Sequence, residues 1–403
     1  MTTTTGAEPQ HGALPILVLN QISALGLARL PSTRYRVGPD VADPVAIVLR
    51  SADLHKADIA PSVRAIARAG AGTNNIPVER MSARGAPVFN APGANANAVK
   101  ELVLAGMLMT ARRIAPALRF VAELEANGDL DARVEDGKKS FAGFELAGRT
   151  LGVIGLGKIG CLVADAGVKL GMQVLGFDPD ITVDAAWSLP SQVKRAGSVN
   201  EVLRASHFVT VHVPLVASTR HLINEANIHL LRDDAVLLNF SRDGVVADDA
   251  VRGALAGRRL AGYVTDFPTS GLLHHEGVIA LPHLGASTRE AEENCAVMVV
   301  DQLRDYLEHG NVVNAVNFPI VTMARESAYR VAIANANVPN MLGQISTTMA
   351  RAGLNIHNMV NKSRGEMAYT LVDVDSPAAD AVLADLARID GVLAVRYLPA
   401  QPG

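Results

Sequence analysis

The segment Leu151–Gly160 constrains the fold of this chain more than any other. Its sequence, LGVIGLGKIG, joins a short apolar run of strand type to a stretch of helical type through a G-x-G-x-x-G pattern. An acidic residue, Asp178, follows the next apolar run. Strand, glycine-rich turn, helix, strand and acid in this order predict a βαβ unit that binds a dinucleotide.

Each part of this motif has a physical reason. Gly155 permits the tight turn, Gly157 lets the backbone approach a pyrophosphate, and Gly160 lets helix and strand pack closely. Amides at the helix N-terminus attract the pyrophosphate. The carboxylate of Asp178 can accept hydrogen bonds from the adenosine ribose and would repel a 2′-phosphate, which favours NAD over NADP. The alternative is a glycine-rich turn without a ligand, but the complete context favours the dinucleotide.

The length of 403 residues predicts two or three domains. The first block opens with apolar runs typical of strands, separated by a helix-like stretch. Strands alternating with helices imply a parallel, doubly wound sheet. The expected strands are Leu14–Leu19, Val45–Leu49 and Ala86–Phe89, and the expected helix is Ile59–Ala69.

A long amphipathic helix, Asn97–Arg113, leads to the second block, and the Lys-bearing stretch Gly137–Ser140 is expected to be a loop. The second block repeats short, nearly continuous apolar strands, as a sheet covered on both faces requires. These strands are Thr150–Ile154, Gln173–Phe177, His207–Val211, Ala235–Asn239, Leu260–Thr265 and Val278–Ala280. A further helix, Ser287–His309, has the length to return to the first block.

The last block follows a linker, Asn311–Ser327, and is smaller. Its order is βαββαβ, the ferredoxin-like split βαβ, with Gly365-Glu366 as the hairpin turn. Its elements are expected at Tyr329–Ala334, Met341–Ala352, Asn355–Lys362, Ala368–Val374, Ala378–Ala387 and Val392–Leu398. We therefore expect two Rossmann-like α/β domains and a C-terminal ferredoxin-like domain. The substrate-binding domain is expected at residues 14–96 and 288–318, the NAD-binding domain at 97–287 and a regulatory domain at 327–403.

Ligands of open α/β sheets bind at the carboxyl ends of the strands. In the second block a histidine, an arginine and an acid follow such ends. Oxidation of an alcohol needs a base in the titration range of histidine, and a carboxylate substrate suits the guanidinium fork of arginine. The segments concerned are His212-Val213-Pro214, Asn239–Gly244, Thr265-Asp266 and Pro282–Ser287.

At this point the chain resembles the D-isomer-specific 2-hydroxyacid dehydrogenase family over nearly its whole length. The matching segments are the glycine motif, His212–Pro214, Ala71–Asn74 (AGTN), Phe89–Pro92 (FNAP), Asn239–Gly244 (NFSRDG) and Pro282–Thr288 (PHLGAST). The resemblance implies that His283 is the acid/base, that Arg242 orients the substrate and that Asp266 holds the nicotinamide amide. The cofactor-binding residues we expect are Gly155, Gly157, Lys158, Ile159, Gly160, Asp178, His212, Val213, Pro214, Phe240, Ser241, Asp266, Gly285 and Ala286.

One departure from the family pattern concerns the acid that pairs with the histidine. Relatives carry a glutamate in the short loop after the aspartate, but here that position holds Ser270 or Gly271, and Glu276 comes too late. A carboxylate partner raises the pKa of a histidine. Without one, the pKa controlling oxidation should be lower than in those relatives. Asp266 could serve both cofactor and histidine; the other outcome is a weak or inactive enzyme.

The resemblance points further to members of the family that oxidise D-3-phosphoglycerate. The backbone of the Gly72 loop would bind the carboxylate, as the matching loop does in the family. The Arg50-Ser51 pair matches a segment near the phosphate, and Lys100, after Asn95, adds a second cation. Each cation has the alternative of a solvated surface group.

The C-terminal block resembles an ACT domain, a small amino-acid-binding module that pairs with a second copy and binds serine between the two. The resemblance implies contacts from Asn335, Asn337 and Asn355, whose amides offer donors and acceptors. Asn335 departs from the histidine of serine-sensing relatives. Asn340 stands where a glycine is usual, and asparagine tolerates the left-handed conformation. The alternative is a domain kept only for oligomerisation.

Composition excludes several classes of protein. The net charge is −3 with no basic stripe, so nucleic acid is not an expected partner. No apolar run approaches the ~18 residues of a membrane span. Met1–Gln10 is Thr-rich and lacks signal-peptide features, which predicts a disordered tail and a cytoplasmic protein. Cys161 and Cys295 are expected to be small buried residues in helices, and no metal is expected.

The function expected from this resemblance is NAD-dependent oxidation of D-3-phosphoglycerate to 3-phosphohydroxypyruvate, the first step of L-serine biosynthesis, in a homo-oligomer (dimer or tetramer) with L-serine as a possible effector. Two alternatives stay open. One is a reductase of hydroxypyruvate or glyoxylate, and the other is a non-catalytic NAD-sensing protein, which only the absent glutamate favours.

Overall fold

The computed structural model describes residues 12–126 and 128–399. The N-terminal tail, for which we predicted disorder, lies outside the described residues. The chain divides into two compact units, residues 1–95 with 289–403 (unit 1) and residues 96–288 (unit 2). Unit 1 thus contains both the first block and the C-terminal block. The three-domain boundaries given above stay a prediction.

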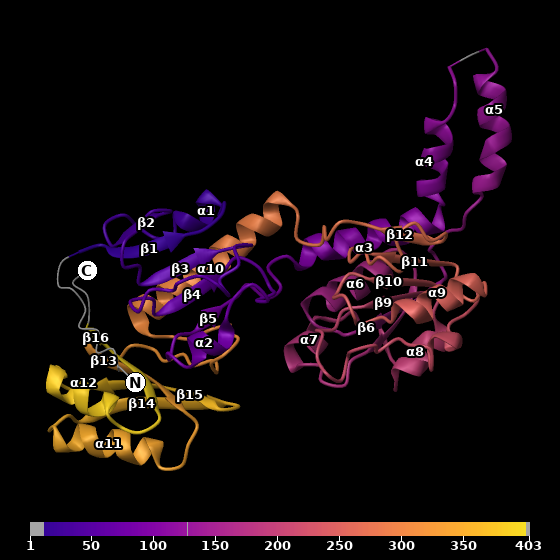
Figure 1. Cartoon of the computed structure of the whole chain (residues 1–403). Helices are drawn as coiled ribbons and strands as arrows, with labels where there is room; N and C mark the ends of the chain where they lie inside the picture. The colour runs from indigo at the N-terminus through magenta and orange to yellow at the C-terminus, as the bar shows by residue number, and fades with distance from the viewer. Residues whose placement is uncertain (1–11, 127, 400–403) are drawn as a thin grey trace. The chain divides into compact units, whose positions relative to one another are not determined.

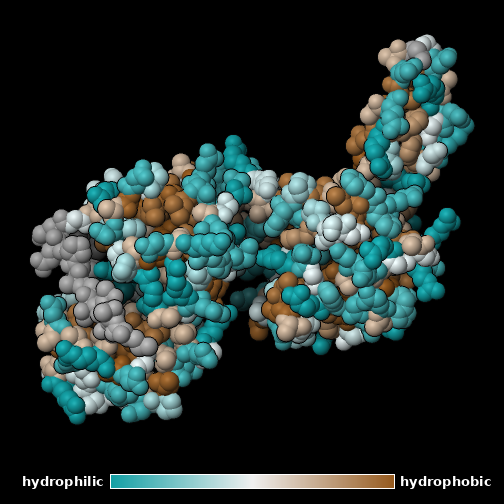
Figure 2. All heavy atoms as spheres, viewed as in Figure 1, coloured by the Kyte–Doolittle hydropathy of each residue, from teal (hydrophilic) through white to brown (hydrophobic). Residues whose placement is uncertain are grey.

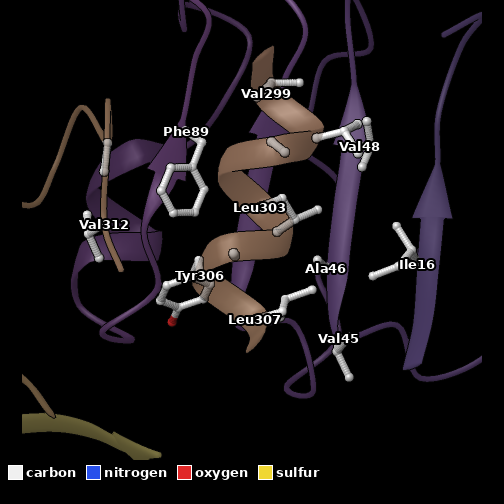
Figure 3. Packing of buried hydrophobic residues seen from close by; sticks show 14 of the residues in the cluster. Ile16, Val45, Ala46, Val48, Phe89, Val299, Leu303, Tyr306, Leu307 and Val312 are labelled. Carbon is white, nitrogen blue, oxygen red and sulfur yellow. The ribbon is translucent and has the colours of Figure 1, made fainter. Parts of the chain in front are cut away.

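The first sheet of unit 1 is entirely parallel, with strand order β2-β1-β3-β4-β5 (Figure 1). Helix α10 (Arg289–His309) lies across it, and Figure 3 shows Leu303 and Tyr306 pointing from the helix toward the strands. The return of this helix to the first block, expected from its length, is therefore confirmed. The strands are β1 (Leu14–Val18), β2 (Tyr35–Gly38), β3 (Ala46–Leu49), β4 (Ala65–Arg68) and β5 (Val88–Phe89), with short helices α1 (Ala24–Leu27) and α2 (Val78–Ser82).

The helix predicted over Ile59–Ala69 is wrong. The segment contains strand β4, which pairs with β3 from Ala65 to Arg68. Its apolar residues recur at helical spacing, but Pro61 precedes the run, and a position between two other strands of a buried parallel sheet takes such short apolar segments as strands. Tertiary pairing has overridden a weak local preference.

The sheet of unit 2 has seven parallel strands in the order β12-β11-β10-β9-β6-β7-β8. All six strands predicted for this block are present, within one or two residues of their expected limits. They are β6 (Thr150–Ile154), β7 (Gln173–Phe177), β9 (Phe208–Val211), β10 (Val236–Asn239), β11 (Gly262–Thr265) and β12 (Val278–Ala280); β8 (Lys194–Arg195) was not foreseen. The helices are α3 (Ala96–Ala111), α6 (Lys158–Lys169), α7 (Val183–Ser188), α8 (Val199–Ala205) and α9 (Asp248–Ala256), with the 3-10 turn η2 (Ile228–Leu230).

Two helices that we did not predict project from unit 2 after α3 (Figure 1). They are α4 (Ile114–Ala122) and α5 (Leu130–Gly137), and neither has a buried residue. The lysine-bearing stretch predicted as a loop is a 3-10 turn, η1 (Lys138–Phe141). We call the segment 114–141 the arm.

The C-terminal sheet is antiparallel with strand order β14-β15-β13-β16, which confirms the predicted βαββαβ arrangement. Gly365 forms the hairpin turn with φ of 58°, and Asn340 precedes α11 with φ of 63°, the left-handed value anticipated for it. The elements are β13 (Tyr329–Ala336), α11 (Met341–Arg351), β14 (Ile356–Arg364), β15 (Met367–Val374), α12 (Asp380–Ala387) and β16 (Val392–Pro399).

Both sheets of unit 1 share one hydrophobic core. Residues of the C-terminal sheet, Tyr369 and Leu371 among them, belong to the same buried cluster as Tyr306 and Phe318. The rings of Phe318 and Tyr369 lie 6.2 Å apart. Arg396 donates to the carbonyl oxygens of the last turns of α10, at Tyr306 (3.1 Å) and Leu307 (3.0 Å).

A buried ion pair lies at the edge of this shared core. Arg330 and Asp373 are both 0% exposed, with Nε to Oδ1 at 2.6 Å and Nη2 to Oδ2 at 2.9 Å. Arg330 also donates to three main-chain carbonyls of the segment before β13, at His309, Met323 and Ala324. The pair thus ties the C-terminal sheet to the segment that leads into it.

Two smaller expectations can be compared with the structure. Cys161 in α6 and Cys295 in α10 are both buried, as predicted, and burial raises the pKa of each thiol. Among the described residues, no helix combines the length and apolar character that a membrane crossing requires.

Candidate active site

The glycine-rich turn of unit 2 forms a cradle that admits no side chain at Gly155 or Gly160, whereas the space beside Gly157 is open. Gly155 has φ of 91°, and a Cβ there would lie 2.5 Å from the carbonyl oxygen of His212. A Cβ at Gly160 would lie 1.9 Å from the Gly155 carbonyl oxygen. Gly157 precedes α6 and no side chain caps the amides of that helix. These amides are the donors that a pyrophosphate needs, so the cradle fits a dinucleotide.

Asp178 follows β7 and is fixed beside this cradle. Its Oδ2 accepts a hydrogen bond from the Leu156 amide at 2.8 Å, and its Oδ1 accepts one from the Asp180 amide at 2.9 Å. The carboxylate is half-buried and retains acceptor capacity. The acid predicted to read the ribose is therefore in contact with the glycine loop.

Four polar residues follow four neighbouring strands. His212 comes after β9, Arg242 after β10, Asp266 after β11 and His283 after β12. These strands are parallel and adjacent in the sheet, so their carboxyl ends share one edge. The strand order reverses between β9 and β6, and that switch point is where ligands of this fold bind. The structure thus places the predicted catalytic pair, His283 and Arg242, on one rim with the cradle.

Asp266 is the most buried of the four, with 1% exposure. Its Oδ2 accepts a hydrogen bond from the Gly285 amide at 3.0 Å, and its main-chain oxygen accepts one from the His283 amide at 2.9 Å. Oδ1 is buried and has no hydrogen-bond partner among the described residues. Burial raises the pKa of this carboxyl, although the Gly285 amide and the charges of His283 and Arg242 act in the opposite direction.

His283 is exposed, and its backbone is in the left-handed region with φ of 37°. For a residue other than glycine this conformation costs about 1–2 kcal/mol, and such strain concentrates at functional sites. The imidazole packs against the ring of Phe267, with 4.7 Å between centroids. The histidine is thus presented outward from a strained turn.

Arg242 is exposed, and its Nη1 donates to the Ser241 carbonyl at 2.6 Å. The loop that carries it is held by Asn239, whose amide oxygen accepts from the amide and hydroxyl of Ser241. Phe240 is 4% exposed and belongs to the hydrophobic core of unit 2. Its expected cofactor contact is therefore limited to the backbone.

His212 is neutral at physiological pH because burial lowers its pKa to about 3. Its Nε2 pairs with the Thr210 hydroxyl at 2.9 Å, and its Nδ1 is buried without a hydrogen-bond partner among the described residues. The part of His212 that lies against the glycine turn is its main chain, whose carbonyl oxygen a Cβ at Gly155 would meet. Val213, Pro214 and Ala286 lie on the same rim, in the loops after β9 and β12.

The loop after Asp266 is the segment in which relatives are expected to carry the glutamate. Ser270 is exposed, and residues 267–275 contain no carboxylate. Glu276 is exposed and directly precedes Gly277 at the start of β12. Asp266 is the acid whose backbone and side chain both hydrogen-bond to the histidine loop.

Unit 1 holds a second polar edge at the carboxyl ends of β3 and β4. Arg50 follows β3, and its Nη1 lies 2.7 Å from Oε1 of Glu292 in α10. Arg68, which we had not selected, ends β4, and its Nε donates to Asn75 at 3.0 Å. A Cβ at Gly70 would lie 2.3 Å from Nη1 of Arg68, so the guanidinium covers the loop that leads to Gly72.

The other predicted substrate-binding residues are Ser51, Asn95 and Lys100. Ser51 is exposed, and its amide donates to Asn20 at 3.1 Å. Asn95 of unit 1 has a buried Oδ1 with no partner among the described residues. Lys100 of unit 2 donates to Asn97 at 2.6 Å and is half-buried on α3.

The three asparagines expected to bind an effector do not come together within one chain. Asn335 pairs in register with Ala368, whereas the Asn355 amide donates to Asp375 at the opposite end of the same sheet. Seven residues of strand separate these ends, on the order of 20 Å. Asn337 lies near Asn335 and donates to Gly365 at 3.0 Å. Asn335 is 1% exposed, and its Oδ1 has no partner among the described residues.

The fold and the site define a class: an NAD-dependent oxidoreductase with a doubly wound nucleotide-binding sheet, a histidine and an arginine on its carboxyl edge. Residues 104–285 match the family model described as "D-isomer specific 2-hydroxyacid dehydrogenase, NAD binding domain". The chain belongs to the D-isomer-specific 2-hydroxyacid dehydrogenase family.

Named relatives agree with this assignment. The chain is 32% identical over 353 residues to the D-3-phosphoglycerate dehydrogenase of Haemophilus influenzae, covering 85% of this chain and 82% of that one. It is 32% identical to the enzyme of the same name from Escherichia coli K12, covering 81% of this chain and 79% of that one. A solved NADPH-dependent glyoxylate/hydroxypyruvate reductase from Sinorhizobium meliloti superimposes with a TM-score of 0.62 at 23% identity, over 78% of this chain and all of that one, and shows the fold alone.

Proposed function

We propose that this NAD-dependent dehydrogenase oxidises D-3-phosphoglycerate to 3-phosphohydroxypyruvate, the first step of L-serine biosynthesis. The observation that carries the proposal is the placement of His283 and Arg242 on the edge that also holds the dinucleotide cradle. The substrate assignment is supported by the names of relatives that match along most of both chains.

In this proposal each residue performs one task of an alcohol oxidation. The Nε2 or Nδ1 atom of His283 accepts the proton of the substrate 2-hydroxyl as the hydride leaves C2. Arg242 pairs with the substrate carboxylate and fixes its orientation. Bound NAD supplies the hydride acceptor. The glycine cradle and Asp178 hold the cofactor, and the half-buried carboxylate of Asp178 favours NAD over NADP by charge repulsion.

We propose that the polar edge of unit 1 holds the acidic ends of the substrate. Arg50 and Arg68 end two neighbouring parallel strands, so their guanidinium groups lie on the same edge of the sheet. Two such forks suit a phosphate dianion. The amides of the Gly72 loop suit a carboxylate, and Ser51 and Asn95 of unit 1 are proposed as weaker contacts. Lys100 of unit 2 is proposed as a further substrate contact. Glu292 neutralises Arg50 in the structure, so phosphate binding must compete with that pair.

The test is a steady-state assay of NADH formation with D-3-phosphoglycerate. His283→Asn should lower kcat at least 100-fold while NADH binding is retained. Arg68→Met should raise KM for D-3-phosphoglycerate about 10-fold or more and leave hydroxypyruvate reduction little changed, because only the former carries a phosphate. Equal kcat/KM for the phosphorylated and unphosphorylated keto acids would support the hydroxypyruvate reductase instead. NADH binding without turnover of any hydroxy acid would support the NAD-sensing protein.

We propose that the C-terminal domain is an ACT domain that binds L-serine. Because Asn335 and Asn355 lie at opposite ends of one sheet, a shared ligand requires Asn355 from a second copy of the chain. Calorimetric titration of L-serine tests this: binding should disappear in both Asn337→Ala and Asn355→Ala and persist in Asn224→Ala, a substitution in unit 2. Equal serine affinity in all three variants would refute the assignment.

We propose that the arm is a homodimer interface. The exposed side chains of α4 include Leu118 (65% exposed) and Val121 (58%), beside a shallow hollow of about 330 Å³ lined by Arg112, Ile114, Ala117, Leu118 and Val121. Figure 2 shows apolar surface on this part of the arm. Arg112 and Arg113 directly precede α4, and α5 carries Asp131, Glu135 and Asp136, the last two paired with Lys138 and Lys139 of the same arm. Both signs of charge are therefore present for contacts between two arms related by a twofold axis.

The molecular mass of the protein, measured by light scattering as it elutes from a gel-filtration column, tests whether the arm is the dimer interface. Wild type should be a dimer or larger, and Leu118→Asp should shift it toward the monomer. The matched control is Leu25→Asp, because Leu25 is exposed to a similar extent (57%) on α1 of unit 1. A Leu118→Asp protein with wild-type mass would exclude the arm as the interface. A cytoplasmic location stays a prediction from the sequence.

A further inference from the structure

The absence of the family's glutamate leaves the base without its usual acidic partner, and among the described residues the buried carboxylate of Asp266 is hydrogen-bonded to the histidine loop. Asp266 follows β11, one strand away from the histidine loop after β12. Oδ2 and the main-chain oxygen of Asp266 accept from the amides of Gly285 and His283, on either side of Leu284. Two hydrogen bonds therefore fix the aspartate to the turn that presents the imidazole.

The second carboxylate oxygen, Oδ1, makes no contact that would explain it within the described part of the structure, although the family resemblance gives Asp266 a contact with the nicotinamide amide. It is buried without a hydrogen-bond partner among the described residues. An unpaired buried carboxylate oxygen costs at least about 1–3 kcal/mol, so its retention next to the base calls for a function. The charged groups that act on this carboxylate are the imidazole of His283 and the guanidinium of Arg242, and both favour its ionised form.

We propose that Asp266 is the acidic positioning partner of His283 and replaces the missing glutamate. This inference rests on the proposed function, because it assigns the source of the charge that stabilises the imidazolium formed when His283 takes the hydroxyl proton. A carboxylate next to imidazole favours the charged ring. It acts from the end of the strand rather than from the following loop, where Ser270 stands.

A consequence follows for the expectation drawn from the sequence. That expectation followed from the absent glutamate and left Asp266 open as the partner of the histidine. In that role Asp266 supplies the negative charge that the glutamate supplies in relatives. Burial raises the pKa of the Asp266 carboxyl, and the positive charges of His283 and Arg242 counteract this, so the carboxylate and the imidazolium stabilise each other.

The test compares pH profiles of wild type and Asp266→Asn. Asparagine keeps the shape of the side chain, and its amide oxygen can still accept from Gly285. The acidic limb of kcat/KM for oxidation should move to lower pH by about one unit or more, with a fall in maximal rate. Ser270→Glu added to Asp266→Asn should move the limb back. Asp234→Asn, which removes an exposed carboxylate of unit 2, should leave the limb in place.

A purely structural role for Asp266 predicts a lower rate with an unmoved limb, and that result would overturn the proposal. The NMR titration of the His283 C2 proton, identified by its loss in His283→Asn, needs no substrate. It should show the same displacement in Asp266→Asn. If wild type fails to oxidise D-3-phosphoglycerate while this displacement appears, the proposed function fails and the pairing stands. If Asp266→Asn does not fold, the pairing is tested in wild type by following the NMR signal of the Asp266 carboxyl carbon with pH. This signal should change over the same pH range as that of His283, and independent titration of the two groups would refute the pairing.

Discussion

The buried pair of Arg330 and Asp373 gives the sharpest stability prediction. Substituting Arg330 by Met keeps most of the side-chain volume and removes all five of its hydrogen bonds, two to Asp373 and three to main-chain carbonyls. Asp373 would then be left as a fully buried carboxylate, with the Glu326 amide at 3.0 Å as its one remaining donor in the part of the chain that the structure describes. Breaking a buried pair in this way costs about 3–5 kcal/mol.

The length of unit 1 determines how far this loss of unfolding free energy lowers Tm. For a unit of this length each kcal/mol lowers Tm by about 2–4 °C, so the expected fall is about 6–20 °C. Circular dichroism melting measures it, and hydrogen exchange of the β13 and β15 amides shows where the loss lies. NADH affinity, a property of unit 2, should remain near the wild-type value.

Arg388→Met is the matched control. Arg388 pairs with Asp385 at 2.6 Å, but the two side chains are 75% and 59% exposed. Exposed pairs of this kind contribute about 0–1 kcal/mol. If Arg330→Met and Arg388→Met melt at the same temperature, the argument from burial is wrong.

Three further predictions concern other parts of the molecule. Gly160→Ala should weaken NADH binding at least 10-fold in fluorescence titration, because the added Cβ would lie 1.9 Å from a carbonyl oxygen. The control is Gly253→Ala in α9, which has open space around it and should bind NADH normally. Burial alone would raise the pKa of Asp373, but hydrogen bonds from Arg330 and Glu326 lower it. The stability that the ionised carboxylate provides is therefore complete above the unfolded pKa of about 3.9 and is lost as the pH falls below that value. Acid unfolding of Asp373→Asn should lack this pH-dependent component. Asn340→Ala should destabilise the C-terminal domain by about 1 kcal/mol in urea unfolding while Asn340→Gly does not, because the position has φ of 63°; equal midpoints would show that this strain is absent.

The sequence predicted the sheet of unit 2 well because each of its strands is a short apolar run between turn signals. The prediction failed at Ile59–Ala69, where an alanine-rich segment satisfies helical spacing although sheet pairing decides its state. That error had a functional cost: Arg68 placed inside a supposed helix gave no sign that it ends a strand beside Arg50. A strand assignment there would have selected it.

The arm was missed for a different physical reason. Pattern-based prediction finds helices through the apolar face they bury, and α4 and α5 bury no residue within the chain.

Asp266 was selected from its place after a strand, but its burial and its unpaired Oδ1 are properties of the packed loops. Residue types and order gave the rim of the site, whereas the contacts within that rim required the three-dimensional structure.

The common core of the two sheets of unit 1 determines what truncation would do to this protein. A chain ended before β13 would lose the cover over Leu303, Tyr306 and Phe318 and present to water an apolar surface that the intact molecule never exposes. Such a product would be prone to aggregation and a substrate for chaperones. Deleting the final module would therefore also remove part of the core that supports the arginine-bearing sheet, so the role of that module is better tested by point substitution.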